Sequence, residues 1–203
     1  LFIHQLPHLW IDFRDIQDDF MAEREIDYFE NSRRATYLQQ RYAIDNPLEY
    51  PRYDEWCWGM TASDGPGPAT LTIDGRKRRF FDYLARGAPG GPDDGTLAPW
   101  SVVTSLPFAP EIVVPTLRYF AEDVRLEEKD AYGLRATFNA CFPTKDETHP
   151  FGWVSPWNYG LNQGPIVMMI ENARTGLIWD LMRACPYLVG GLRRAGFRGG
   201  WLA

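Results

Sequence analysis

The chain has 203 residues, of which 45% are hydrophobic and 24% are charged, a composition that suits one globular domain with a substantial core. Its net charge of −6 argues against DNA or RNA as a partner, because a phosphate backbone selects a basic surface. Aromatic residues reach 15% and include 8 Trp. This excess of large amphipathic side chains calls for a functional explanation.

The first half of the chain predicts two helices and a hairpin. An apolar entry segment precedes a short predicted helix at 13–21. A clearer helix is predicted at 27–45, because apolar side chains recur at helical spacing and Asn46-Pro47 ends the pattern. A hairpin is predicted within 69–84, with its turn at Asp74-Gly75.

The second half is mainly helical. A helix is predicted at 110–124, which Pro115 would kink or delay, followed by a short strand or irregular stretch at 134–142. The widest apolar stripe predicts one helix over 165–184 with Pro165 in its first turn, and a last short helix runs over 186–196. Long loops rich in aromatic residues, Gly and Pro separate these helices, and such loops are usually functional. The pattern favours an α/α barrel, although an irregular helical domain would also fit.

The sequence predicts neither a metal site nor a cofactor. Three widely spaced cysteines fit no zinc or disulfide pattern, and we interpret them as small buried hydrophobes: Cys57, Cys141 and Cys185. His4 and His8 have neighbouring aspartates at a spacing that suggests metal ligands, but Pro7 disrupts the helix that would align them. Hydrogen-bonded histidines near the core are the preferred interpretation. No nucleotide-binding or nucleophile-elbow motif is present.

Acidic and aromatic residues cluster at 53–64. Glu55 and Asp64 lie among the rings of Tyr53, Trp56 and Trp58. Glycoside hydrolysis needs two carboxyl groups across the scissile bond, and aromatic faces stack on the C–H faces of sugar rings. This cluster therefore predicts a carbohydrate site, and the alternative is a solvated loop of carboxylates beside core aromatics.

Further candidate sugar contacts lie in two later segments. Asp94, in the turn at 91–96, is predicted to bind sugar hydroxyls rather than calcium, because the EF-hand spacing is absent; it could instead cap a turn. The segment 151–163 repeats the aromatic density, and the amide of Gln163 can both donate and accept hydrogen bonds. A packed aromatic corner is the alternative. The predicted contacts here are Trp153, Trp157, Tyr159, Gln163 and, on the long helix, Glu171.

Short strings occur in one order from end to end of the chain: WIDFR (10–14), YFENSRRA (28–35), WGMTASDGP (58–66), DDGTLAP (93–99), SLPFAPE (105–111), GPI (164–166) and IEN (170–172). Together they resemble the glycoamylase-like domain of bacterial β-1,2-glucanases and cyclic β-1,2-glucan synthases. Characterised relatives include family 144 endo-β-1,2-glucanases, which invert the anomeric centre, and cyclising transglycosylase domains. Both have an (α/α)6-barrel fold.

The resemblance implies that residues 1–203 form the C-terminal part of one such barrel, so the upstream half would be an intramolecular partner. It implies that an essential carboxylate, the general acid, lies upstream of Leu1. Glu55, just before the WG string, matches an acidic position and is the candidate nucleophile or base, while Asp64 would orient substrate or water.

The sequence therefore predicts a glycoside hydrolase that acts on β-1,2-glucan. The alternatives are a transglycosylating cyclisation domain, a non-catalytic glycan-binding module and a structural domain of a large synthase. A hydrolase would be periplasmic or secreted, and a synthase would be associated with the inner membrane.

Overall fold

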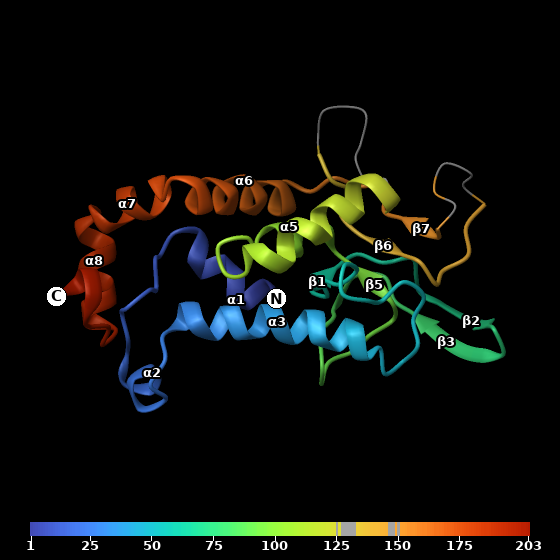
Figure 1. Ribbon diagram of the computed structural model, residues 1–203, viewed down its shortest axis with the longest axis horizontal. Helices are drawn as coiled ribbons and strands as arrows, with labels where there is room; N and C mark the ends of the chain where they lie inside the picture. Colours follow the sequence, from blue (N-terminus) through green and yellow to red (C-terminus); the bar gives the residue numbers. More distant parts are fainter. Residues whose placement is uncertain (125, 127–132, 146–148, 150) are drawn as a thin grey trace.

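A computed structural model describes residues 1–124, 126, 133–145, 149 and 151–203, and it is mainly helical, as the sequence predicted (Figure 1). The helical segments are α1 (Phe2–Gln5), η1 (Leu6–Leu9), α2 (Asp19–Glu23), α3 (Tyr28–Asp45), α4 (Pro99–Val103), α5 (Pro110–Tyr119), η2 (Phe120–Val124), α6 (Gly160–Arg174), α7 (Leu177–Arg183), α8 (Pro186–Arg194) and η3 (Gly200–Leu202). In Figure 1, α3 and α6 run along opposite long sides of the molecule, and the strands gather at one end.

The strands are short and antiparallel. They are β1 (Ala62–Ser63), β2 (Ala69–Ile73), β3 (Arg76–Phe80), β4 (Leu84–Ala85), β5 (Thr96–Leu97), β6 (Phe138–Asn139) and β7 (Trp153–Val154). β1 pairs with β4, and β6 is the central strand between β5 and β7. β2 and β3 form the predicted hairpin, with Asp74 (φ 49°) and Gly75 (φ 75°) in the left-handed region that a two-residue hairpin turn requires.

Local capping explains where α3, the longest helix of the described chain, begins and ends. The side chain of Asp27 accepts a 2.7 Å hydrogen bond from the backbone N–H of Glu30, which satisfies a free donor in the first turn. At the other end Asn46 adopts a left-handed conformation, and its side chain bonds to the backbone of Tyr50. The predicted helix at 27–45 is therefore confirmed, with Asp27 as its N-cap and not its first helical residue.

Two predicted helices were wrong in their boundaries. The stripe at 165–184 is two helices, because Gly176 adopts φ 73° between α6 and α7, and α6 begins five residues before Pro165. The predicted helix at 13–21 is replaced by the shorter α2, whose N-cap Asp18 accepts from the backbone N–H of Met21 at 2.8 Å. Asp15 has φ 63°, which is incompatible with a helix through 13–18. The helices predicted at 110–124 and 186–196 are confirmed, the first with Pro115 inside it.

The main core lies beneath the strand-rich end. Trp58 is completely buried there, and its indole N–H donates a 2.8 Å hydrogen bond to Thr116 of α5. Cys57 and Cys141 are buried free thiols, as predicted, whereas Cys185 is only partly buried. The aromatic segment at 50–58 thus contributes part of its rings to the core.

His8 packs edge-on against Phe108, which belongs to a smaller core cluster, and is hydrogen-bonded, as predicted, with Nε2 3.0 Å from Ser32 Oγ. Within the described ranges, no group of three or more His, Cys, Asp or Glu side chains is arranged to hold a metal ion. The described helices include none with the combined length and apolarity that crossing a lipid bilayer requires.

Candidate functional site

A pocket of about 200 Å³ brings together two carboxylates and several aromatic rings. Asp64 follows β1, Asp82 follows β3, and the N-terminal turn of α6 closes the pocket from the far end of the sequence. The lining residues are Phe2, Ala62, Ser63, Asp64, Asp82, Tyr83, Trp100, Tyr159, Leu161 and Asn162. Carboxylates, hydroxyls and an amide beside flat rings can bind a polar ligand that also has apolar faces.

The side chain of Asp64 is held by two hydroxyl donors. Thr137 Oγ1 donates to Oδ1 at 3.0 Å, and Ser155 Oγ donates to Oδ2 at 2.5 Å. Thr137 immediately precedes β6 and Ser155 immediately follows β7, and a 2.9 Å backbone hydrogen bond joins them. The three-stranded sheet therefore orients this carboxylate, and each oxygen keeps lone pairs with which to accept from a ligand hydroxyl or water.

The walls of the pocket combine exposed rings with a buried donor. Tyr83 and Tyr159 are exposed, whereas Trp100 is 2% exposed. The indole N–H of Trp100 is buried and has no acceptor among the described residues, which leaves an unsatisfied donor on a ring that lines the pocket. Burial, and then the charges of Asp64 and Asp82, raise the pKa of Tyr159, so its hydroxyl remains protonated and can donate.

The first predicted acid–aromatic cluster is divided by the fold. Asp64 lines the pocket, but Glu55 is exposed and does not, and its backbone carbonyl accepts a 2.8 Å hydrogen bond from Gln40 of α3. Trp56 is also exposed. The rings of Tyr53 and Trp58 are buried, so neither has a face on which a sugar could stack. A catalytic role for Glu55 stays a prediction.

The second predicted cluster, at 151–163, is hydrogen-bonded to Asp64 through Ser155. The backbone N–H of Trp157 donates to Ser155 Oγ at 3.2 Å, and Ser155 in turn bonds to Asp64. Trp157 is 61% exposed, Tyr159 lines the pocket, and Trp153 is partly buried in β7. This segment therefore presents rings beside the carboxylate, as a sugar-binding surface would.

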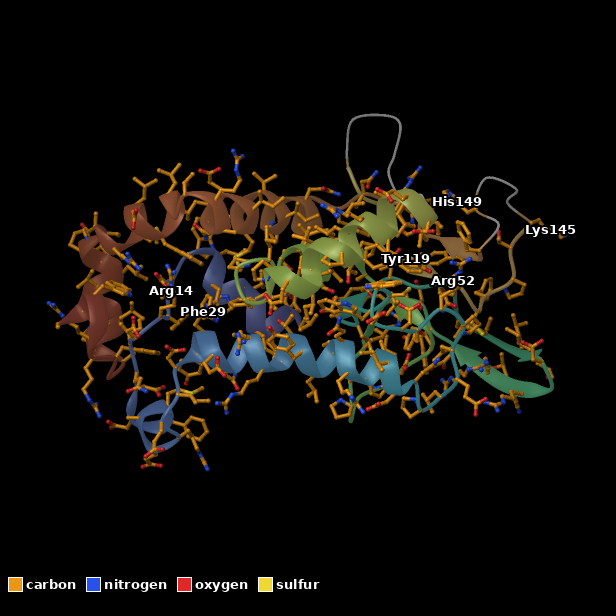
Figure 2. All side chains as sticks on the ribbon, in the orientation of Figure 1. Arg14, Phe29, Arg52, Tyr119, Lys145 and His149 are labelled. Atoms are coloured by element: carbon orange, nitrogen blue, oxygen red, sulfur yellow. The ribbon has the colours of Figure 1, made fainter. Side chains whose placement is uncertain are left out.

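The two ring-rich segments also adjoin each other through Arg52. Its guanidinium lies 4.2 Å from the centre of the Phe151 ring and donates a 2.9 Å hydrogen bond to the hydroxyl of Tyr119. Figure 2 shows Arg52 beside Tyr119 at the strand-rich end of the molecule. The contact joins the loop at 50–58 to the segment that leads into β7.

The remaining predicted contacts have internal partners. Asp94 is completely buried and forms an ion pair with Arg86, with Oδ1 2.7 Å from Nε, so its carboxylate binds protein groups rather than an exposed sugar hydroxyl. Gln163 Nε2 donates to the carbonyl of Leu134 at 3.0 Å. Glu171 accepts a 2.6 Å hydrogen bond from Thr175 near the end of α6. Neither Gln163 nor Glu171 lines the pocket around Asp64.

Sequence reasoning missed Asp82, Tyr83 and Trp100. The Asp82-Tyr83 pair has the same acid–aromatic signature as the predicted cluster, but it lies within the segment 69–84, for which the sequence predicted only a hairpin. Trp100 lies in α4, which was not predicted. Asn162 belongs to the predicted amide-rich segment and lines the pocket, but it lies buried in the first turn of α6, which begins before the predicted helix.

The family model named Glycoamylase, described as "Putative glucoamylase", matches residues 1–186. The chain belongs to this family. A glycoamylase relative from Parabacteroides distasonis, an exo β-1,2-glucooligosaccharide sophorohydrolase (non-reducing end), is 32% identical over 173 residues. That match covers 85% of this chain and 21% of the relative.

Solved structures of similar proteins have a similar fold. An endo-β-1,2-glucanase from Chitinophaga pinensis, in complex with sophorotriose and glucose, superposes with a TM-score of 0.76 at 26% identity, covering 99% of this chain and 41% of that one. A Bacteroides uniformis protein described as a "putative glucoamylase" superposes with a TM-score of 0.77 at 34% identity, covering 100% of this chain and 42% of that one. The chain thus spans well under half the length of the relatives it matches.

Proposed function

We propose that the protein containing this chain is a glycoside hydrolase that acts on β-1,2-linked glucan. The observation that carries the proposal is the carboxylate of Asp64, held by Thr137 and Ser155 in a pocket walled by exposed tyrosines. Relatives named for β-1,2-glucan hydrolysis support this substrate class. We also propose that the chain is the C-terminal part of an (α/α)6 barrel, with the general acid in the upstream part.

The proposed chemistry divides the work between two carboxyl groups. Asp64 orients or deprotonates the attacking water, and a second carboxyl group protonates the leaving oxygen. The reaction inverts the anomeric centre. Asp82 shares the pocket with Asp64 and binds substrate hydroxyls near the reacting sugar. Glu55 remains the second candidate for the base, on the strength of its place before the WG string.

The proposed binding surface uses rings that solvent can reach. Tyr83, Tyr159 and Trp157 stack on sugar faces, and Trp56 and Trp153 extend the surface at its margins. The indole N–H of Trp100 donates to a substrate oxygen within the pocket. Tyr53 and Trp58 are left out of this surface because their rings are buried.

The test is hydrolysis by the full-length protein of β-1,2-glucan, with β-1,3-, β-1,4- and α-1,4-glucans as parallel substrates. We expect short β-1,2-linked oligosaccharides from the first polymer and no products from the others. Cleavage of the α-1,4-glucan instead would reject the proposed linkage. The initial product, followed by NMR, should be the α-anomer, because inversion of a β-linkage produces it.

The same assay separates the alternatives. Cyclic products would indicate a transglycosylating cyclisation domain, and binding of β-1,2-glucan without any turnover would indicate a glycan-binding module. As a hydrolase, the protein is proposed to be periplasmic or secreted, and cell fractionation with an antibody tests this location. Recovery in the inner-membrane fraction would favour the synthase.

A further inference from the structure

Arg86 and Asp94 form a completely buried, bidentate ion pair behind the pocket. Both side chains are 0% exposed. Arg86 Nε donates to Asp94 Oδ1 at 2.7 Å, and Nη2 donates to Oδ2 at 2.8 Å. Two parallel hydrogen bonds of this kind fix the plane of the guanidinium as well as its position.

The remaining N–H groups of Arg86 bind the backbone that carries the pocket's two carboxylates. Nη1 donates to the carbonyl of Ser63 at 2.7 Å and to that of Asp64 at 3.4 Å. Nη2 donates to the carbonyls of Phe81 and Asp82 at 3.2 Å and 3.1 Å. One guanidinium therefore joins the segment of Asp64 to the segment of Asp82.

Asp94 extends the same connection. Its Oδ2 accepts from the backbone N–H of Phe81 at 3.0 Å, so the segment at 81–82 is bonded to both members of the ion pair. Its carbonyl accepts from Asn139 Nδ2 at 2.9 Å, and Asn139 belongs to β6, the strand that follows Thr137. The ion pair is thus also tied to the sheet that orients the Asp64 side chain.

Gly65 permits this arrangement. A Cβ atom at Gly65 would collide with Nη2 of Arg86 and with the carbonyl oxygen of Phe81. The backbone just after Asp64 therefore passes directly against the guanidinium, which explains why a residue without a side chain stands there.

We infer that Arg86, held by Asp94, is a positioning residue that sets the relative placement of the Asp64 and Asp82 carboxylates across the pocket. This inference rests on the proposed function. A planar guanidinium with five donors can bond to the carboxylate and to both segments at once, whereas the single ammonium of a lysine cannot.

The experiment uses Arg86→Lys and Asp94→Asn in the full-length protein, assayed on β-1,2-glucan below the melting temperature of each variant. Displacement of catalytic groups by about 1 Å costs about 10²-fold in rate, so we expect kcat to fall by about 10²-fold for Arg86→Lys. We expect KM and glucan binding by calorimetry to change by less than about 10-fold, because the rings that bind the sugar remain and only the hydroxyl contacts of Asp82 are displaced. Asp94→Asn keeps the side-chain volume and one acceptor oxygen, and it serves if Arg86→Lys does not fold.

Arg78→Lys is the matched control. Arg78 also donates to two backbone carbonyls, those of Leu48 and Glu49, at 3.3 Å and 2.9 Å, but it lies on the hairpin and does not line the pocket. A purely structural effect would lower the melting temperature in both lysine variants and leave kcat unchanged. The inference is overturned if folded Arg86→Lys or folded Asp94→Asn turns over glucan at the wild-type kcat.

A double variant identifies the group through which Arg86 acts. If Arg86 positions Asp64, adding Arg86→Lys to Asp64→Asn should lower kcat by less than about 3-fold more, because the positioned carboxylate is already absent. If the fold-losses in kcat of the two single variants multiply in the double variant, the inference is overturned and the proposed function is left intact. A wild-type protein that does not cleave β-1,2-glucan would instead reject the proposed function, and with it the inference built on that function.

Discussion

Ser155 Oγ donates a 2.5 Å hydrogen bond to Asp64 Oδ2 across 91 residues of sequence. Together with Thr137 on the other oxygen, it orients a carboxylate that would otherwise rotate at the pocket wall. Both donors belong to residues that flank paired strands, so the orientation depends on the sheet rather than on a mobile loop. This arrangement makes Asp64 the first residue to test.

Asp64→Asn should lower kcat on β-1,2-glucan by about 10²–10⁴-fold, the range for loss of a general acid or base. The amide has the same shape and still accepts from one hydroxyl, so the melting temperature should change little. Steady-state kinetics and thermal unfolding of the full-length variant check both statements. Wild-type turnover would remove Asp64 from the mechanism. Glu55→Gln, assayed in parallel, tests the assignment of Glu55 as nucleophile or base. If that assignment is right, the variant should lose cleavage and still bind glucan.

Trp100→Phe should weaken glucan binding about 5-fold, because one neutral hydrogen bond contributes about 1 kcal/mol. Its melting temperature should fall less than that of the control, since the indole donor has no acceptor among the described residues in the free protein and only buried ring volume is lost. Trp58→Phe is the matched control, because that indole bonds to Thr116 within the core. The control should lose about 1 kcal/mol more stability than Trp100→Phe, the cost of the lost hydrogen bond, and keep its affinity. Calorimetry showing unchanged affinity for Trp100→Phe would contradict the proposed contact.

Trp157→Ala should raise KM or Kd for glucan about 5-fold, since loss of a stacked ring removes about 1 kcal/mol. The ring is 61% exposed, so its removal should leave the melting temperature nearly unchanged. Trp10→Ala is the control and should keep wild-type affinity, because this exposed indole lies at the end of η1, whereas Trp157 is bonded through its backbone to Ser155 beside Asp64. Equal effects of the two substitutions would argue against a specific stacking site at Trp157.

His8 should make stability depend on pH. Burial is the main cause that lowers its pKa to about 4, and the charge of His4 adds to it; the Tyr28 backbone and the charge of Asp12 act in the opposite direction. Between pH 4 and 6.5 the unfolded chain binds the proton and the folded chain does not, so the free energy of unfolding rises with pH. This contribution, about 3 kcal/mol, is complete above pH 6.5 and lost below pH 4.

Urea unfolding of His8→Gln at several pH values checks this sign. The variant keeps a polar side chain but cannot titrate, so its stability should vary less than that of the wild type across the window from pH 4 to 6.5. His4 remains in both proteins, so its own lowered pKa does not enter the difference. An equal pH dependence in the two proteins would contradict the role of His8.

Gly176→Ala should destabilise the protein by about 1 kcal/mol, because φ 73° is strained for a residue with a Cβ atom. The only described heavy atom near a Cβ at this position is Asp180 Oδ2, at 3.9 Å, so a steric clash does not contribute. Gly190→Ala, within α8 and without a positive φ, is the control and should not destabilise. Denaturant unfolding measures both, and a stability gain for Gly176→Ala would show that α6 and α7 can join.

The sequence could predict the elements whose signals lie within a few residues of one another. Helix α3 has its cap at Asp27 and its end at Asn46, and the hairpin has Asp74-Gly75 between its strands. The failure at 165–184 has a local cause as well, since the apolar stripe continues past Gly176 while the backbone does not. Periodicity describes which face is apolar and not whether one helix or two present it.

By itself the sequence determined that the protein is mainly helical, which loops carry acids among aromatic rings, and which family its ordered strings resemble. Only the tertiary structure decided that Trp58 is buried while Trp157 is exposed, and that Asp94 pairs with Arg86 instead of facing a sugar. The physical reason is that capping and periodicity act over a few residues, whereas burial and the partners of a carboxylate depend on chain segments that fold together from distant positions.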